Sequence, residues 1–390
     1  MKKRLLLIIV FSILLLGCSV IETQEPTTLE VPVPDVEYPS EVEEGAVNSE
    51  MPVPRKESVE EMVAEVPLRS GCARVFSPTF SSSPHYNGPL FDAHFHMPNL
   101  IDFNAIGHGE SPGTGYETNS NKDPVLGNDI ELSKLLCNFD KETVIGVIGF
   151  AIGAEQASEE TISRAKSVKD ESLGKINLFL MPRMFSVESL DYTQEKNPNL
   201  FKGYGEVGFY TSLYVNTLPD SQEMMDVYAV AGKHNLIVMI HPDARQESMV
   251  ENAIKKNPDV KFLIHGPEIE NSIINIVGKY PNAYYSIDAI LIRSPGSPGG
   301  LIYTTNNLQE LKSSFSQNYE RMMNDAVNKW KSKIEKYPDK FMWGTDRAYL
   351  WHYDEGVGIL LEEFGRDFIA ELNPEVQQRF AYKNAEALLS

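Results

Sequence analysis

The feature that most constrains the fold of this 390-residue chain is a repeating order of short apolar runs and amphipathic segments. The apolar runs have the length and unbroken hydrophobicity of parallel strands that are covered on both faces. We expect eight such strands, at residues 89–94, 143–151, 176–183, 203–209, 236–241, 261–265, 284–288 and 341–345.

Helical segments fill most of the gaps between these strands. They are recognised by helix-start residues and by apolar side chains at helical spacing, and we expect them at residues 128–137, 158–168, 224–234, 246–256, 269–279 and 307–336. Strand and helix alternating eight times predicts an α/β chain folded as a (β/α)8 TIM barrel, with an open doubly wound sheet as the alternative. Two Gly- and Pro-containing insertions, residues 98–127 and 289–305, follow strand ends, where barrel enzymes build substrate pockets.

Polar residues gather at the carboxyl ends of the predicted strands. His94 and His96 end the first strand, and alternation along a strand turns residues i and i+2 to the same side. Single polar residues mark four later strands: Glu206 on the fourth, His241 on the fifth, His265 on the sixth and Asp346 on the eighth. Parallel strands bring these ends together, so the sequence predicts a nitrogen and oxygen ligand set for a divalent transition ion.

Each of these residues also has an ordinary structural explanation. A lone histidine in a strand is more often a hydrogen-bonded core residue, Asp346 could cap a helix, and Glu206 could be a buried acid. The ordered set favours the ligand interpretation, because four of the eight histidines end strands. The other four, His85, His108, His234 and His352, lie in predicted loops or at a helix end, and we assign them no metal role.

The ordered set resembles the amidohydrolase superfamily, and within it the amidohydrolase-related group that includes decarboxylases and lactonases. The resemblance runs from about Leu90 to the closing helix at residues 382–389. Residues 205–209, Gly-Glu-Val-Gly-Phe, also resemble the TatD-like deoxyribonuclease branch, in which the glutamate bridges two metals. No lysine stands at the position of the carboxylated bridging lysine, since Lys202 falls at the strand start. The number of ions, one or two, stays open.

The resemblance implies a metal-dependent hydrolase acting on an ester, lactone, amide or phosphoester. His94, His96 and His241 would hold the metal, zinc first and manganese, iron or nickel as alternatives, and the ion would lower the pKa of bound water towards about 7 to give a hydroxide. Asp346 would contact the metal or take the proton of the water and pass it to the leaving group. His265 would bind a second ion or polarise the substrate oxygen. Asp92 or Asp288 would accept a hydrogen bond from a metal-bound imidazole.

Two other functions remain open at this stage. Non-oxidative decarboxylation at the same centre would need a cation for the substrate carboxylate, for which Arg183, Arg293 and Arg347 are candidates. A non-catalytic surface protein that keeps a structural metal is the third hypothesis. Asp346 argues mildly against it, since structural zinc sites are usually closed by four Cys or His ligands.

The N-terminus predicts export and attachment to a membrane. Residues 1–17 combine a basic start with a 12-residue apolar run, too short to span a bilayer as a helix, and lead into Leu-Gly-Cys18, which resembles a lipobox. A lipid on Cys18 would anchor the protein to the cell membrane. Residues 18–70 form the predicted disordered tether, with seven prolines and 13 acidic against three basic residues.

Residues 71–390 then remain for a single barrel domain. The formal net charge of −20, with no basic run, makes nucleic acid an unexpected partner and a small-molecule substrate the expected one. Cys72 and Cys137 are the cysteines left after Cys18; in an exported protein they either form a disulfide or stay as two buried thiols.

Overall fold

The structure of the chain is a computed structural model that describes residue 72 and residues 85–98, 100, 130–153, 159–182, 186–210, 217–297, 299–348 and 350–390. The chain divides into two units, Met1–Glu61 and Met62–Ser390, and every described residue lies in the second. Cys18, the signal and tether segments, Arg183, His108 and almost all of the insertion at 98–127 lie outside the described residues.

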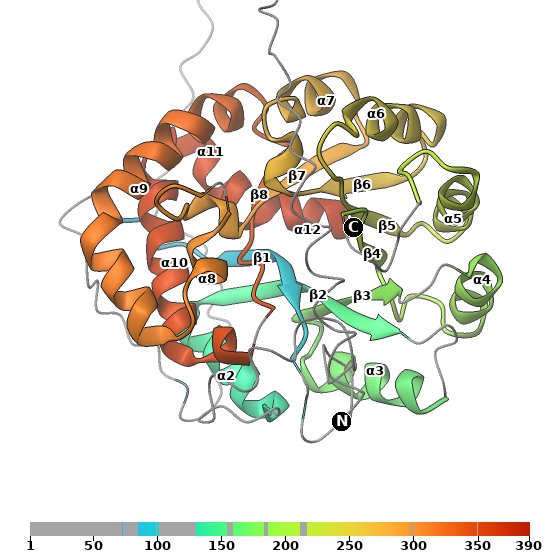
Figure 1. Cartoon of the computed structure of the whole chain (residues 1–390). Helices are drawn as coiled ribbons and strands as arrows, with labels where there is room; N and C mark the ends of the chain where they lie inside the picture. Colours follow the sequence, from blue (N-terminus) through green and yellow to red (C-terminus); the bar gives the residue numbers. More distant parts are fainter. Residues whose placement is uncertain are drawn as a thin grey trace, which may run out of the picture. The chain divides into compact units, whose positions relative to one another are not determined.

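Eight parallel strands stand in sequence order around the centre of the second unit, and helices surround them (Figure 1). The prediction of a (β/α)8 TIM barrel is therefore confirmed, and each expected strand is found within two residues of its predicted bounds. The strands are β1 (Leu90–His96), β2 (Val144–Gly153), β3 (Ile176–Pro182), β4 (Gly203–Gly208), β5 (Ile237–His241), β6 (Lys261–Ile264), β7 (Ala283–Ile287) and β8 (Phe341–Trp343).

The helices are α2 (Leu132–Glu142), α3 (Glu159–Glu171), α4 (Val187–Lys196), α5 (Gln222–Lys233), α6 (Glu247–Lys256), α7 (Ile273–Lys279), α8 (Leu301–Thr304), α9 (Leu308–Lys336), α10 (Glu355–Ala370), α11 (Pro374–Gln378) and α12 (Asn384–Leu389). Ser221 and Asn307 cap α5 and α9, because their side chains accept from the backbone N–H groups of Met224 and Glu310. Among the described residues no helix is both long and apolar enough to cross a bilayer.

Two helices were not expected, α4 and α10. In α4 Leu190 is the one buried apolar residue, so no repeat is visible. In α10 Val357, Leu360, Phe364 and Phe368 recur at helical spacing, so the sequence carried a signal for this helix that the prediction missed.

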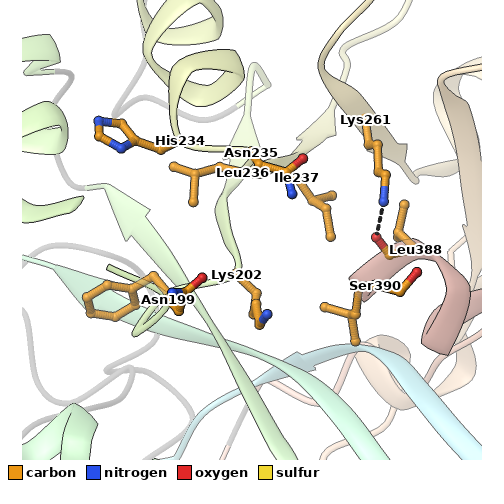
Figure 2. Close-up of a pocket in the computed structure, with 11 residues that line it drawn as sticks. Asn199, Lys202, His234, Asn235, Leu236, Ile237, Lys261, Leu388 and Ser390 are labelled. Atoms are coloured by element: carbon orange, nitrogen blue, oxygen red, sulfur yellow. Dashed lines mark hydrogen bonds between the residues drawn. The ribbon is translucent and has the colours of Figure 1, made fainter. Parts of the chain in front are cut away.

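The apolar core has two parts. Side chains inside the barrel, among them Ile148, Phe179 and Met239, pack with Leu388 of α12, which therefore covers the amino-terminal end of the barrel. The larger part lies between the strands and the surrounding helices. A small cavity of about 70 Å³ lies at the amino-terminal end, where Lys202, Ile237 and Lys261 begin or precede strands and Lys261 donates to the Leu388 carbonyl (Figure 2).

β8 closes the barrel against β1 through the backbone. Asp346 N–H donates to the His94 carbonyl at 2.8 Å, and His96 N–H donates to the Arg347 carbonyl at 3.1 Å. The buried Asp92 carboxylate strengthens this seam, because it accepts from the backbone N–H groups of His94 (3.1 Å) and Thr345 (2.9 Å) and from the Thr345 hydroxyl (2.5 Å).

Cys72 and Cys137 form a disulfide with a Cα–Cα distance of 5.2 Å across 65 positions. The bond connects the segment before β1 to α2. Of the two alternatives that the sequence left open, a disulfide or two buried thiols, the structure has the disulfide.

We expect the double variant Cys72→Ser/Cys137→Ser to lose about 2–4 kcal/mol of unfolding free energy, because its unfolded chain is no longer closed into a long loop. Urea unfolding of the oxidised protein measures the loss. A reductant should lower the stability of the wild type and leave the double variant unchanged; a wild type that ignores the reductant would contradict the expectation.

Candidate metal centre

The six residues singled out at strand ends meet at the carboxyl end of the barrel. His94 and His96 lie on β1, Glu206 on β4 and His241 at the end of β5. His265 follows β6 and Asp346 follows β8. The structure brings potential ligand atoms of all six within reach of one another in overlapping groups.

The two β1 imidazoles face each other and the Asp346 carboxylate. The Nε2 atoms of His94 and His96 lie 3.2 Å apart, and each lies 3.2 Å from Asp346 Oδ1. Asp346 has a left-handed backbone with φ 53°, a conformation that aspartate tolerates better than most residues. This turn, fixed by the bond from Asp346 N–H to the His94 carbonyl, directs the carboxylate back towards β1.

Glu206 lies between two pairs of histidines. Its Oε2 lies 3.6 Å from His94 Nε2 and 3.2 Å from His96 Nε2. Its Oε1 lies 3.0 Å from His241 Nδ1 and 2.5 Å from His265 Nε2. The pairing of β4 with β5 shifts register between Tyr204 and Val207, and such irregularities re-aim a side chain beside a site.

Glycine at position 205 permits this local path of β4. Its φ is +129°, and a Cβ there would collide with the backbone oxygen of Met239 on β5.

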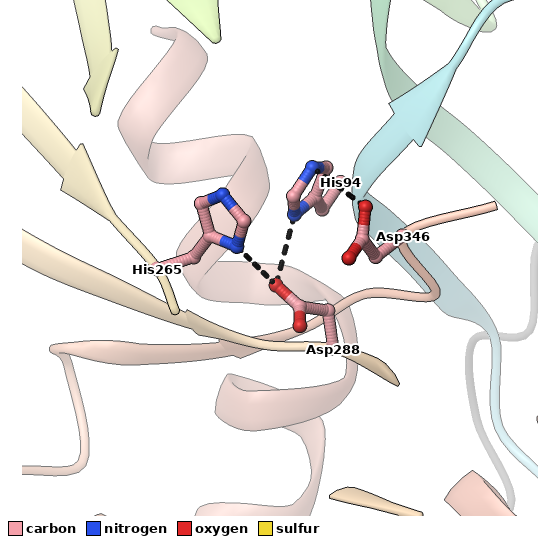
Figure 3. A group of neighbouring side chains, drawn as sticks. All are labelled: His94, His265, Asp288 and Asp346. Carbon is pink, nitrogen blue, oxygen red and sulfur yellow. Dashed lines mark hydrogen bonds and ion pairs between the residues drawn. The ribbon is translucent and has the colours of Figure 1, made fainter. Parts of the chain in front are cut away.

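Two further carboxylates hold the outer nitrogens of the imidazoles. Asp288 Oδ2 lies 2.8 Å from His94 Nδ1 and 3.2 Å from His265 Nδ1 (Figure 3). Glu268 Oε2 lies 2.9 Å from His241 Nε2. A carboxylate accepts, so the outer nitrogens of His94 and His241 donate, and their opposite ring nitrogens, which face Glu206 or Asp346, keep their lone pairs in the neutral imidazoles.

The carboxylates dominate the electrostatics of the centre. Burial lowers the pKa of His94, but Asp346, Asp288 and Glu206 outweigh it and raise that pKa to about 10. In the same way burial is outweighed by carboxylates at His96 and His265, and the pKa of each is raised to about 9. Burial raises the pKa of Glu206, yet the surrounding histidines hold it well below its usual value. The centre therefore requires positive charge, which either protons or cations can supply.

The donor set fits a divalent transition ion. Ligand bonds of about 2.0–2.2 Å in a tetrahedron place neighbouring donors about 3.4 Å apart. The Nε2 atoms of His94 and His96 lie 3.2 Å from each other and 3.2–3.6 Å from the nearest Glu206 and Asp346 oxygens. Imidazole nitrogens with carboxylate oxygens are the ligands that zinc, manganese, iron and nickel accept.

Two expectations about neighbouring residues need correction. Asp92, offered as an acceptor for an imidazole, instead binds the backbone at the β1–β8 seam, while Asp288 takes the role at the rings. Arg347, offered as a partner for a substrate carboxylate, is buried and paired with Glu142 at 2.7 and 3.1 Å. Its side chain leaves the barrel interior because it follows Asp346 directly and points the opposite way.

Sequence reasoning missed Glu268, which lies in the 3-10 turn Pro267–Ile269 three residues after His265. The available signal was an acidic residue soon after a strand-end histidine. That signal is weak, because an acid in a surface turn is common and nothing in the sequence indicates its reach to His241.

Three of the histidines that were set aside lie in the described residues, and each has partners elsewhere. His85 pairs with Asp367 and His234 with Asp191, both at 2.6 Å. His352 is fully buried: its Nδ1 accepts from Ala348 N–H at 3.2 Å and its Nε2 donates to the Ile302 carbonyl at 3.1 Å.

Residues 199–390 match the amidohydrolase family. The match begins just before β4 and includes Glu206, His241, His265 and Asp346. No curated protein matches the chain significantly.

Among solved structures, the chain is similar to an amidohydrolase from Burkholderia multivorans with bound HEPES (11% identity, TM-score 0.49) and to the same protein with bound zinc (10% identity, TM-score 0.49). Each comparison covers 77% of this chain and 99% of the other. A dihydroxybenzoic acid decarboxylase from Polaromonas sp. JS666, with bound manganese and 2-nitroresorcinol, has 12% identity and a TM-score of 0.44 over 77% of this chain and 97% of its own.

The buried His352 gives a prediction for stability against pH. Burial lowers its pKa to about 3 in the folded protein, against 6.5 ordinarily. The unfolded chain therefore binds a proton below about pH 6.5 that the folded protein refuses, so this contribution to stability is present above pH 6.5 and is lost as pH falls towards 3.

As pH falls from 6 to 4, the free energy of unfolding of the wild type should decrease by up to about 1.4 kcal/mol per pH unit more than that of His352→Gln. Glutamine keeps a hydrogen-bond donor and an acceptor at this position. Unfolding free energies from urea titrations at each pH measure the difference. Equal slopes for wild type and His352→Gln would refute the assignment.

Proposed function

We propose that this protein is a metal-dependent hydrolase of the amidohydrolase type, acting on an ester, lactone, amide or phosphoester. The observation that carries the proposal is the position of Glu206, whose two oxygens each face a different pair of histidines. A carboxylate between two imidazole pairs suits two divalent ions, with Glu206 contacting both.

In this proposal His94, His96, Asp346 and Glu206 would hold one ion, and His241, His265 and Glu206 would hold the other. When bound, the ions supply Lewis acidity that acidifies water and polarises a substrate carbonyl or phosphoryl oxygen. Asp288 orients one imidazole of each pair through its single Oδ2 atom.

Asp346 is the proposed general base and acid. Its side chain is 15% exposed, whereas Asp288 is 1% exposed, so Asp346 is accessible from the open end of the barrel. Its backbone is held by the N–H bond to the His94 carbonyl and by the Tyr303 hydroxyl, which donates to the Asp346 carbonyl at 2.5 Å. A carboxylate fixed in this way can take a proton from water and return it to the leaving group.

Decarboxylation is the alternative at the same centre, and two of the three arginines considered for a substrate carboxylate have other partners, while Arg183 lies outside the described residues. A carboxylate substrate calls for a cationic partner, but Arg347 is paired with Glu142 and Arg293 with Glu270. Within the described part of the chain, neither of these arginines is left for a substrate.

Metal content and turnover test the proposal together. The domain loaded with Zn²⁺ or Mn²⁺ should retain about two equivalents by elemental analysis and should hydrolyse members of a panel of aryl esters, lactones and phosphodiesters. Asp346→Asn should lower kcat about 10²–10⁴-fold, because the variant lacks the proposed base and acid.

Asp243→Asn is the matched control. It removes an exposed carboxylate at the same end of the barrel, two residues after His241, and should leave metal content and turnover unchanged. Turnover by Asp346→Asn at the wild-type rate, or a wild type that retains no metal, would overturn the proposal.

We also propose that the protein is exported and held at a membrane surface by a lipid on Cys18. The Cys72–Cys137 disulfide supports export, because such bonds persist in oxidising compartments.

For the anchor, the full chain expressed in a bacterium should incorporate a radiolabelled fatty acid and sediment with membranes, whereas Cys18→Ala should do neither. A membrane-bound, unlabelled wild type would contradict the lipid anchor.

A further inference from the structure

His241 presents a different nitrogen to the centre from the other three histidines. His94, His96 and His265 turn Nε2 towards the central carboxylates, whereas His241 turns Nδ1 towards Glu206 Oε1. Its Nε2 lies 2.9 Å from Glu268 Oε2. Neutral imidazole carries one N–H, so the nitrogen that donates to Glu268 decides which nitrogen keeps a lone pair for a ligand bond.

The backbone beside this pair is shaped to let it form. Gly266 has φ +107°, and a Cβ there would lie 2.5 Å from His241 Nε2 and 2.8 Å from Glu268 Oε2. Its carbonyl accepts from the Tyr285 hydroxyl at 2.7 Å, which fixes the peptide that leads into the Glu268 turn. Glycine at 266 therefore leaves the space that the imidazole and the carboxylate occupy.

The same pair lies on the open side of the centre. The Glu268 side chain is 28% exposed and that of His241 is 12% exposed, while Asp288 is 1% exposed. The Tyr210 ring packs on the His241 ring with a centroid distance of 4.3 Å. The imidazole therefore has Glu206 at Nδ1 and Glu268 at Nε2, and loss of Glu268 would leave Nε2 to water.

We propose that Glu268 is a positioning residue that locks His241 in the tautomer whose Nδ1 faces the second ion, an inference that rests on the proposed binuclear function. Glu268 acts through His241 and does not contact that ion itself. Without Glu268, His241 stays in the chain but its ring is divided between tautomers and orientations. Binding of the second ion is then weaker, while binding of the first ion is unchanged.

Titration of the metal-free protein with Mn²⁺ tests this directly. In wild type we expect two ions to bind and to give the electron paramagnetic resonance signal of an exchange-coupled pair. In Glu268→Ala we expect the second ion to bind about 10–100-fold more weakly, the typical effect of removing such a partner, with the first ion unchanged. Glu268→Gln, whose amide oxygen can still accept from Nε2–H, should recover part of the loss.

Two controls separate this effect from others. Asp243→Asn removes a nearby charge without touching His241 and should bind both ions as the wild type does. His241→Ala should lose the second ion and the coupled signal altogether.

The outcomes of the titration distinguish the two proposals. A wild type that binds fewer than two ions would overturn the binuclear function and this inference with it. If the wild type binds two ions and Glu268→Ala binds the second ion as tightly and keeps the coupled signal, only the role of Glu268 is overturned.

Discussion

The seam between β8 and β1 is the constraint on which the centre depends. Two backbone hydrogen bonds join the strands, and they involve His94, His96 and Asp346 themselves. The same hydrogen bonds therefore close the barrel and bring His94, His96 and Asp346 together. Asp92, beneath them, ties the N–H groups of His94 and Thr345 together, and Arg347 carries the connection outward to Glu142 on α2. A buried, paired arginine of this kind is costly to disrupt, because removal of either partner leaves an uncompensated charge.

Charge balance explains why the centre is built from alternating acids and imidazoles. Four carboxylates, from Glu206, Glu268, Asp288 and Asp346, contact four imidazoles in a mostly buried volume. Burial alone would drive the imidazoles to their neutral form, yet the acids raise their pKa values. Cations that replace the protons would supply the same positive charge and leave the outer N–H groups of the rings bonded to Asp288 and Glu268. The carboxylates that stabilise the protonated rings would therefore also orient them for ions.

The sequence predicted the barrel and the convergence of the six strand-end residues because both follow from local patterns. Buried parallel strands are unbroken apolar runs, and their carboxyl ends share one edge by topology. Helix α4 escaped prediction because it buries little, whereas α10 carries apolar residues at helical spacing that the prediction overlooked. Arg347 was misjudged because its neighbour in sequence, Asp346, faces the interior, and its true partner Glu142 lies 205 positions away. Glu268 was missed since its reach depends on the left-handed turn at Gly266, which sequence spacing does not reveal.

The two carboxylates at the outer ring nitrogens, Asp288 and Glu268, differ in exposure: Asp288 is buried and Glu268 is partly exposed. Asp288 is buried, and its Oδ2 atom lies beside the rings of both His94 and His265. It therefore connects the histidines near Asp346 with those near Glu268. Glu268 and Asp346 are the more exposed acids, and they come from the loops after β6 and β8. Among the described acids of the centre, Glu268 and Asp346 are therefore nearest the open end, while Arg293 and Arg347 are paired with other acids. In the proposed hydrolase, a substrate oxygen that gains negative charge would then depend on bound ions, not on either of these arginines, for its stabilisation.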